Sequence, residues 1–143
     1  MTENRILGIG NALVDALVQV PDDAILNELN LPKGSMQLID TDFYERLCQR
    51  LSSMEVKRAT GGSACNTMLA LAQMGAAPGL IGKISDDDNG RFFADSCTTN
   101  GIQAQLLPSE LRTGVASTFI TPDGERPSAT YLGAAAAMTA ADL

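Results

Sequence analysis

The middle of the sequence alternates short extended patterns with longer helical ones, and this alternation strongly restricts the possible folds. Parallel neighbouring strands need a crossover of a dozen or more residues, usually a helix, whereas antiparallel strands can follow a tight turn. The alternation therefore predicts an α/β core with a parallel sheet. The expected elements are an extended piece at 55–59, a helix at 64–74, a strand at 79–84, a helix from Asp86–Asp88 to Gly101, and a strand at 102–107.

Segments on either side of this region do not fit the alternation. Residues 6–20 are apolar but are interrupted by Gly8 and Gly10, which predicts one strand followed by another and places Asp15 inside a strand. Residues 114–132 form two extended runs around Pro122-Asp123-Gly124-Glu125, the pattern of a β-hairpin. We therefore expect a small β appendage beside the α/β core. Short helices are expected at 24–29 and from Thr41 or Asp42, with a short strand at 36–39 between them.

Length and charge indicate the class of protein. The 143 residues suffice for one ordinary domain with a sizeable core, and a second complete domain is not expected. The net charge of −7 repels phosphate backbones and anionic lipid, so neither a nucleic acid nor a membrane is expected as a partner. No apolar run reaches the roughly 18 residues of a membrane span, and residues 1–5 show no basic leader. A cytoplasmic protein is expected.

The cysteine and histidine content excludes several kinds of site. Cys48, Cys65 and Cys97 are an odd number without a Cys-x-x-Cys pair, so neither a disulfide framework nor a zinc site is predicted. The lack of histidine removes Ser-His-Asp and Cys-His catalysis. The acidic cluster Asp86–Asp88 is better explained by capping of the following helix than by a metal, so no metal site is predicted.

A glycine pair that leads into a helix is the most informative candidate for a binding site. Gly61 and Gly62 allow close approach to the backbone, and the helix behind them, with Ser63 as the expected N-cap, offers free amides to a polar or anionic ligand. A tight turn chosen for packing explains the glycines as well. Asn66 lies in the first turn of a helix that is expected to be buried, so its amide needs a partner, either a backbone carbonyl or a ligand hydroxyl.

Asp15, in the strands expected at 6–20, likewise needs a hydrogen-bonding partner if it is buried. A lone carboxylate among apolar residues either faces solvent, which the sequence alone favours, or accepts hydrogen bonds from a specific partner. Gly8-Ile9-Gly10 contains part of a dinucleotide-binding fingerprint. Leu13 stands at the third glycine position, however, and a strand is expected to follow, which argues against a dinucleotide-binding oxidoreductase. The sequence has no P-loop.

Three motifs occur in a recognisable order. They are Gly8-Ile9-Gly10-Asn11 with Asp15, Gly61-Gly62-Ser63-Ala64-Cys65-Asn66 with Gly75, and Gly82-Lys83-Ile84-Ser85-Asp86-Asp87 with Gly90. Together they resemble the N-terminal half of the ribokinase-like (PfkB-type) carbohydrate kinases, over nearly the whole chain. The opening motif and the hairpin that ends at Leu132-Gly133-Ala134-Ala135 are most similar to the adenosine kinase branch. Two positions depart from the family pattern, because Met68 stands where a small residue is usual and Ser85 where glycine is usual.

The resemblance implies a fold and a site. The fold is a ribokinase-like three-layer α/β/α core with a parallel sheet and a small β-sheet lid, with lid strands near 14–20, 36–39 and 114–132, and residues 1–143 would be its N-terminal part. Two chains could meet through the lid as a homodimer. Asp15 and Asn66 would hold sugar hydroxyls, since a carboxylate and an amide suit vicinal hydroxyls. The implied substrate-binding residues are Asn11, Asp15, Gly61, Gly62, Asn66 and Arg126.

The resemblance also implies an activity. A complete family member would transfer the γ-phosphate of ATP, with Mg²⁺, to a hydroxymethyl group of a small-molecule sugar or nucleoside. Arg126 either approaches the substrate on closure or is a solvated turn residue. No catalytic residue is assigned in this chain, because the Gly-Ala-Gly-Asp-like turn that carries the family's catalytic base is not found in residues 134–143. The alternative is a non-catalytic sugar- or nucleoside-binding or oligomerisation module.

Overall fold

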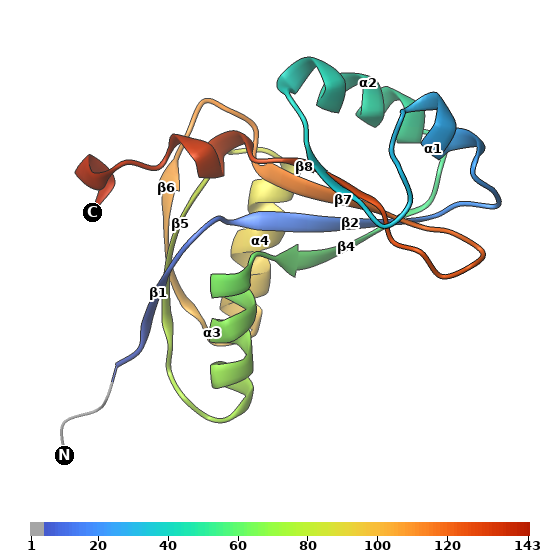
Figure 1. Ribbon diagram of the computed structural model, residues 1–143. Coiled ribbons are helices and arrows are strands. Elements are labelled where there is room, and N and C mark those ends of the chain that lie inside the picture. Colours follow the sequence, from blue (N-terminus) through green and yellow to red (C-terminus); the bar gives the residue numbers. More distant parts are fainter. Residues whose placement is uncertain (1–4) are drawn as a thin grey trace. The chain divides into compact units, whose positions relative to one another are not determined.

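The computed structural model describes residues 5–143, which form two compact units built from interleaved segments (Figure 1). The first unit contains the described residues up to Val14 together with Thr60–Gly114 and Gly133–Leu143. The second unit contains Asp15–Ala59 and Val115–Leu132. Within the described part of the chain, no helix has the length and apolar character that a membrane crossing requires.

The sheet of the first unit is parallel throughout. It consists of β1 (Leu7–Ile9), β5 (Gly79–Ile84) and β6 (Gln103–Pro108), in the spatial order β1-β5-β6. Helix α3 (Ser63–Gln73) contacts β1 and β5, and helix α4 (Asp88–Thr99), which forms the crossover from β5 to β6, contacts β6. The predicted α/β core with a parallel sheet is confirmed.

The ends of α4 follow from its sequence. The carboxylate of Asp87, the N-cap, accepts a hydrogen bond from the backbone N–H of Gly90, as expected for an acidic residue before a helix. Gly101 follows the helix with a φ of +73°, a left-handed conformation that ends helices and favours glycine. Phe93 and Cys97, four residues apart on one face of α4, are fully buried in the core of the first unit.

The sheet of the second unit is mixed. Its hairpin is confirmed, since β7 and β8 pair antiparallel, while β3 and β8 pair parallel. The extended piece expected at 55–59 is the start of a longer strand, β4, which lies at one edge of this sheet. In spatial order the strands are β3 (Met36–Leu38), β8 (Ser128–Tyr131), β7 (Gly114–Ile120), β2 (Leu13–Gln19) and β4 (Val56–Gly61).

Two helices cover one face of this mixed sheet (Figure 1). They are α1 (Ala24–Glu28) and α2 (Thr41–Leu51), both close to their expected positions. Their apolar side chains form one buried cluster with alternate residues of the strands, including Val18, Leu47 and Phe119. Because strand side chains alternate between faces, the other residues of the same strands lie on the opposite face, which carries neither helix.

Two expectations about α3 are wrong. Its N-cap is Gly62, and Ser63 is already the first helical residue. Its buried residues are Cys65 and Met68, whereas Met74 is 83% exposed. The apolar composition of the helix predicted burial on nearly all sides, but α3 contacts the sheet of the first unit along one side.

The last residues of the chain form two short 3₁₀ turns, η1 (Gly133–Ala137) and η2 (Ala140–Asp142). Thr139 is the N-cap of the second turn. The Lys83 ammonium, at the end of β5, donates hydrogen bonds to the Ala137 carbonyl at 3.1 Å and to the Asp142 carboxylate at 3.0 Å. These contacts fasten both turns to the sheet of the first unit.

Candidate functional site

The glycine turn between β4 and α3 packs against the backbone of Asn11 so closely that only glycine fits at Gly62. Gly62 has a φ of +89°, a left-handed conformation in which side chains are strained. A Cβ atom at Gly62 would lie 2.3 Å from the backbone oxygen of Asn11, far inside van der Waals contact. The turn therefore lies against the loop between β1 and β2. Asn11, Gly61 and Gly62, three of the expected site residues, meet at this point in the first unit.

Asn66 lies one helical turn beyond Gly62, and its backbone N–H donates to the Gly62 carbonyl at 2.9 Å. Its side chain is exposed, so the expectation of a buried amide is wrong. The error comes from the apolar composition of α3, which overstated how much of the helix is covered. Gly62, the N-cap, supplies no side-chain hydrogen bond to this end of α3. The amide of Asn66 and the first turn of α3 are thus open to a polar ligand.

Asp15 lies in β2, as the sequence predicted, and belongs to the second unit. Val14 and Ala16, its neighbours in the strand, are buried, while Asp15 is half-buried on the opposite side of the strand with Leu13 and Leu17. This is the face that carries neither α1 nor α2. Partial burial raises the pKa of the Asp15 carboxyl above its ordinary value, because removal of water penalises the charged form. A hydroxyl donor would restore part of the lost solvation.

Arg126 is exposed and lies between β7 and β8 in the second unit, just past the turn of the hairpin. Lys33 fixes the nearby part of this hairpin through two ion pairs. Its ammonium lies 2.7 Å from the Asp123 carboxylate and 2.9 Å from that of Asp23. The Thr121 hydroxyl also donates to Asp123. The hairpin turn that carries Arg126 is therefore tied to the start of α1.

This ion pair gives a prediction about acid stability. The Lys33 ammonium, followed by the Thr121 hydroxyl, lowers the pKa of Asp123 from 3.8 to about 2. Because the folded-state pKa is the lower one, the pair stabilises the fold fully above the ordinary pKa and loses this contribution as the pH falls towards 2. We expect wild type to melt slightly above Asp123→Asn at neutral pH, with the gap closing in acid. A gap that stays constant in thermal melts down to about pH 2 would contradict this assignment.

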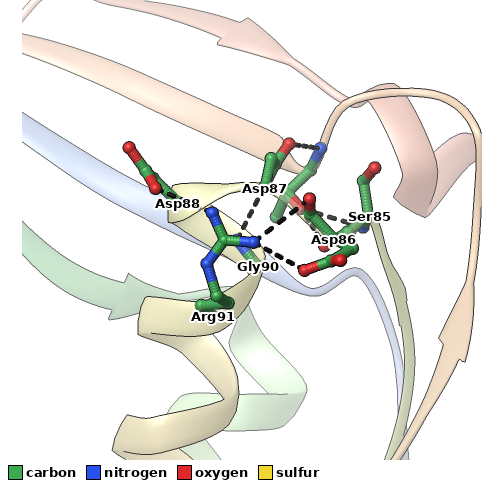
Figure 2. A network of polar contacts seen from close by, with 7 residues as sticks. Ser85, Asp86, Asp87, Asp88, Gly90 and Arg91 are labelled. Atoms are coloured by element: carbon green, nitrogen blue, oxygen red, sulfur yellow. Dashed lines mark hydrogen bonds and ion pairs between the residues drawn. The ribbon is translucent and has the colours of Figure 1, made fainter.

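The acidic cluster before α4 is a structural network (Figure 2). One carboxylate oxygen of Asp87 accepts from the Gly90 N–H at 2.7 Å, and the other accepts from the Thr113 N–H at 2.9 Å. The Thr113 hydroxyl accepts in turn from the Ser85 N–H at 2.9 Å. The sequence predicted the cap, but the link to Thr113 was missed because 26 residues separate the partners.

The other two acids of the cluster pair with one arginine. Arg91 lies 2.6 Å from Asp86 and 2.9 Å from Asp88, and all three side chains are exposed (Figure 2). Among the described residues, no group of three potential ligands is placed to hold a metal ion. The carboxylates of this cluster thus stabilise the connection between β5 and α4.

Comparison with known proteins identifies the family of this chain. A family model described as pfkB family carbohydrate kinase matches residues 33–143, which is most of the chain. The chain belongs to the pfkB family of carbohydrate kinases. The resemblance noted in the sequence is therefore confirmed.

The names of two curated relatives of this pfkB chain indicate that those proteins act on a sugar and on a riboside. Fructokinase-2 of Solanum lycopersicum is 33% identical over 83 residues, which are 57% of this chain and 25% of the relative. Aminoimidazole riboside kinase of Salmonella typhimurium is 36% identical over 77 residues, which are 52% of this chain and 24% of the relative. The matched segments thus cover about a quarter of each relative.

Solved structures bear out the ribokinase-like α/β fold. Adenosine kinase from Sinorhizobium meliloti matches 99% of this chain with a TM-score of 0.83 and 36% identity, and a probable sugar kinase from Rhizobium etli matches 100% with a TM-score of 0.84 and 33% identity. Anopheles gambiae adenosine kinase, at 22% identity and a TM-score of 0.88, supports the fold alone. This chain spans 43% of each of these three structures.

The two departures from the family pattern have local explanations in this pfkB chain. Met68 is buried, and its side chain lies about 3.1 Å from the Cβ position of Gly8, so the larger residue fills space that this glycine leaves open. Ser85 uses its backbone N–H to bind Thr113, so its side chain is not needed for that bond.

Proposed function

We propose that the complete protein, in the cytoplasm, transfers the γ-phosphoryl group of ATP to a hydroxymethyl group of a sugar or nucleoside, and that this chain supplies residues that bind the acceptor. The observation that supports the proposal most is the glycine turn, where Gly62 lies against the Asn11 backbone and opens directly into the uncapped first turn of α3. An uncapped helix start with free amides and an exposed amide side chain suits a polar, hydroxyl-rich ligand.

The proposed acceptor-binding residues divide between the units. In the first unit, Asn66 offers an amide that donates and accepts, and Gly61 and Gly62 let a ring lie close to the backbone beside Asn11. In the second unit, the half-buried Asp15 carboxylate accepts hydrogen bonds from vicinal hydroxyls, and the exposed guanidinium of Arg126 approaches the substrate or its phosphate. This is the set that the sequence implied: Asn11, Asp15, Gly61, Gly62, Asn66 and Arg126.

Among the described residues, the acidic cluster before α4 is not free to hold the Mg²⁺ that accompanies ATP. The carboxylate of Asp87 is used by two backbone amides, and Asp86 and Asp88 pair with Arg91. The family implies that ATP, with Mg²⁺, is the phosphoryl donor. We therefore assign both to the part of the family's length that this chain does not span.

A phosphoryl-transfer assay tests the proposal. Protein expressed from the complete reading frame is incubated with ATP, Mg²⁺ and a panel of sugars and nucleosides, and the phosphorylated acceptor is detected by mass spectrometry. We expect transfer to at least one acceptor, with no transfer when Mg²⁺ is chelated. Binding without transfer would replace the kinase by a non-catalytic binding module, and neither binding nor transfer would overturn the proposal.

Removal of single acceptor-binding groups is expected to weaken acceptor binding. Asp15→Ala and Asn66→Ala each remove a hydrogen-bonding partner of a substrate hydroxyl, which costs about 1–3 kcal/mol, or roughly 5- to 150-fold in affinity. Nucleotide affinity should change little. Isothermal titration calorimetry measures both affinities, with the exposed Asn27→Ala as the matched control for Asn66. Unchanged acceptor affinity in both variants would refute the assignment.

The edge strand β3 of the mixed sheet is the proposed surface for a homodimer. Met36 and Leu38, two residues apart on the edge strand β3, are 74% and 69% exposed and lie on the same face. An apolar edge strand of this kind suits pairing with a second copy. Analytical ultracentrifugation should find a dimer that Met36→Lys with Leu38→Lys dissociates, whereas the control Met74→Lys on α3 leaves it intact. A monomeric wild type would contradict the proposal.

A further inference from the structure

The β7–β8 hairpin is attached to the first unit at one joined point. The chain passes into the second unit after Gly114 and returns to the first unit at Gly133. Between these positions β7 and β8 pair antiparallel. Just outside the hairpin, in the first unit, the backbone N–H of Ala134 donates to the Arg112 carbonyl at 2.8 Å. The segment that enters the hairpin and the segment that leaves it are therefore bound to each other.

Thr113, the residue before β7, is held by its backbone and by its side chain, and it is fully buried. Its N–H donates to the Asp87 carboxylate at 2.9 Å, and its hydroxyl accepts from the Ser85 N–H at 2.9 Å. Both partners lie in the connection between β5 and α4, within the first unit. These bonds fix the position and the rotation of Thr113 at the point where the chain enters β7.

The space around Thr113 is filled as well. Gly90, in the first turn of α4, is buried, and a Cβ atom there would overlap the Ser85 backbone oxygen and lie 2.9 Å from the Thr113 hydroxyl. The start of α4 thus packs against Ser85 and Thr113 without room for a methyl group at Gly90. Asp87 caps the same helix end through the Gly90 N–H. We refer to Ser85, Asp87, Gly90 and Thr113 as the Thr113 clamp.

The other two passages between the units are built differently. They follow Val14 and Ala59, which lie inside strands β2 and β4. The hairpin passages instead fall at the first residue of β7 and just after the end of β8. The ladder hydrogen bonds of a sheet restrain a strand interior on both sides, whereas a strand end depends on the residues that precede it. The Thr113 clamp supplies that restraint for the hairpin.

A small change at the clamp produces a larger displacement at the far end of the hairpin. Strand β7 has seven residues, which at about 3.3 Å per residue form an arm of about 20 Å. A tilt of about 5° at the clamp would then displace the far end by about 2 Å. Arg126 lies just past the turn at this far end. Because a displacement of about 1 Å can impair a group that positions a substrate, the clamp has enough leverage to matter.

We propose that Asp87 and Thr113 are positioning residues, which set the orientation of the β7–β8 hairpin and thereby the place of Arg126. Neither residue needs to contact the acceptor. Both act through the hairpin, because they fix the point from which it leaves the first unit. The consequence for acceptor binding rests on the proposed function, whereas the orientation of the hairpin does not.

A distance measurement between two spin labels tests the orientation of the hairpin. The labels are attached to Glu125→Cys, next to Arg126, and to Met74→Cys on α3, two exposed positions, in protein from the complete reading frame whose other exposed cysteines are replaced by serine. Pulsed electron paramagnetic resonance gives the distribution of their distances. Thr113→Val keeps the shape of the side chain but leaves the Ser85 N–H without its acceptor. We expect the mean distance to shift, or the distribution to broaden, by about 2 Å or more.

Three further variants make the outcome decisive. Asp87→Asn should act like Thr113→Val, because an amide cannot accept from both N–H groups as the carboxylate does, and it provides the test if Thr113→Val does not fold. Thr113→Ser retains the hydroxyl and should keep the wild-type distribution. Asp88→Ala removes an exposed carboxylate that pairs with Arg91, and it should also leave the distribution unchanged. An unaltered distribution in Thr113→Val and Asp87→Asn would overturn the proposal, as would an equal change in Asp88→Ala.

Calorimetric titration with the sugar or nucleoside that the phosphoryl-transfer panel identifies tests the link to Arg126. Thr113→Val should weaken binding of this acceptor about 10-fold and leave nucleotide affinity unchanged. In an Arg126→Ala background the same substitution should have little further effect, because the group that the clamp positions is already absent. Additive losses would overturn the link between the clamp and Arg126. If no member of the panel binds to the wild type, the proposed function fails, and the spin-label distances still decide whether the clamp orients the hairpin.

Discussion

Gly62→Ala is expected to destabilise the fold by about 2–5 kcal/mol and to abolish acceptor binding. A non-glycine residue at a left-handed φ costs about 1–2 kcal/mol, and steric overlap in a packed site adds about 1–3 kcal/mol. Both apply here, because the new Cβ would lie 2.3 Å from the Asn11 backbone oxygen at a φ of +89°. The backbone oxygen cannot rotate away as a side chain would, so the turn must open. Urea unfolding followed by circular dichroism measures the loss of stability.

Gly75 provides a matched control for this substitution. It has the same φ of +89°, but a Cβ atom there meets nothing within 4 Å. Gly75→Ala should therefore cost only the backbone strain, about 1–2 kcal/mol, and leave acceptor binding unchanged. The difference between the two variants isolates the contact with Asn11. Equal destabilisation by both substitutions would show that this contact does not hold the turn.

Asp87→Ala is expected to destabilise the first unit by about 2–4 kcal/mol, because it removes two hydrogen bonds to one carboxylate. One caps α4 through Gly90, and the other joins the start of α4 to the segment that enters β7 through Thr113. Loss of the carboxylate leaves the buried Thr113 N–H without its acceptor. Chemical unfolding and hydrogen exchange at residues 85–90 and 112–114 measure the effect.

Asp40 is the matched control for Asp87. It caps α2 through a single hydrogen bond from the Phe43 N–H at 2.8 Å, and its surroundings are exposed. Asp40→Ala should cost about 1 kcal/mol, the usual value for a helix cap. If Asp87→Ala costs no more than Asp40→Ala, the bond to Thr113 contributes nothing and the network in Figure 2 is only a cap.

Most of the fold could be predicted because its signals are local. Glycines and acidic residues mark where helices begin and end, and the hairpin is marked by the turn at Pro122-Asp123-Gly124-Glu125. The assignment of β4 to the mixed sheet could not be predicted, because strand pairing depends on partners distant in the sequence. The N-cap of α3 is Gly62, one residue before the expected Ser63. Gly62 takes a left-handed φ, which a sequence pattern does not reveal.

The sequence motifs could name candidate site residues, but they could not show the surroundings of each one. The motifs located Gly62, and the structure explains its identity by the Asn11 oxygen, a contact across 51 residues that no local pattern reveals. Burial of Asn66 was predicted wrongly, because composition shows that a helix is apolar but not which side is covered.

The central claim is that this chain carries the residues that hold the acceptor. A thermal-shift panel of sugars and nucleosides, run without nucleotide on wild type, Asp15→Ala and Asn66→Ala from the complete reading frame, tests it most directly. We predict that at least one acceptor raises the melting temperature of the wild type and that both variants lose most of this shift. An acceptor that stabilises all three proteins equally would contradict the claim.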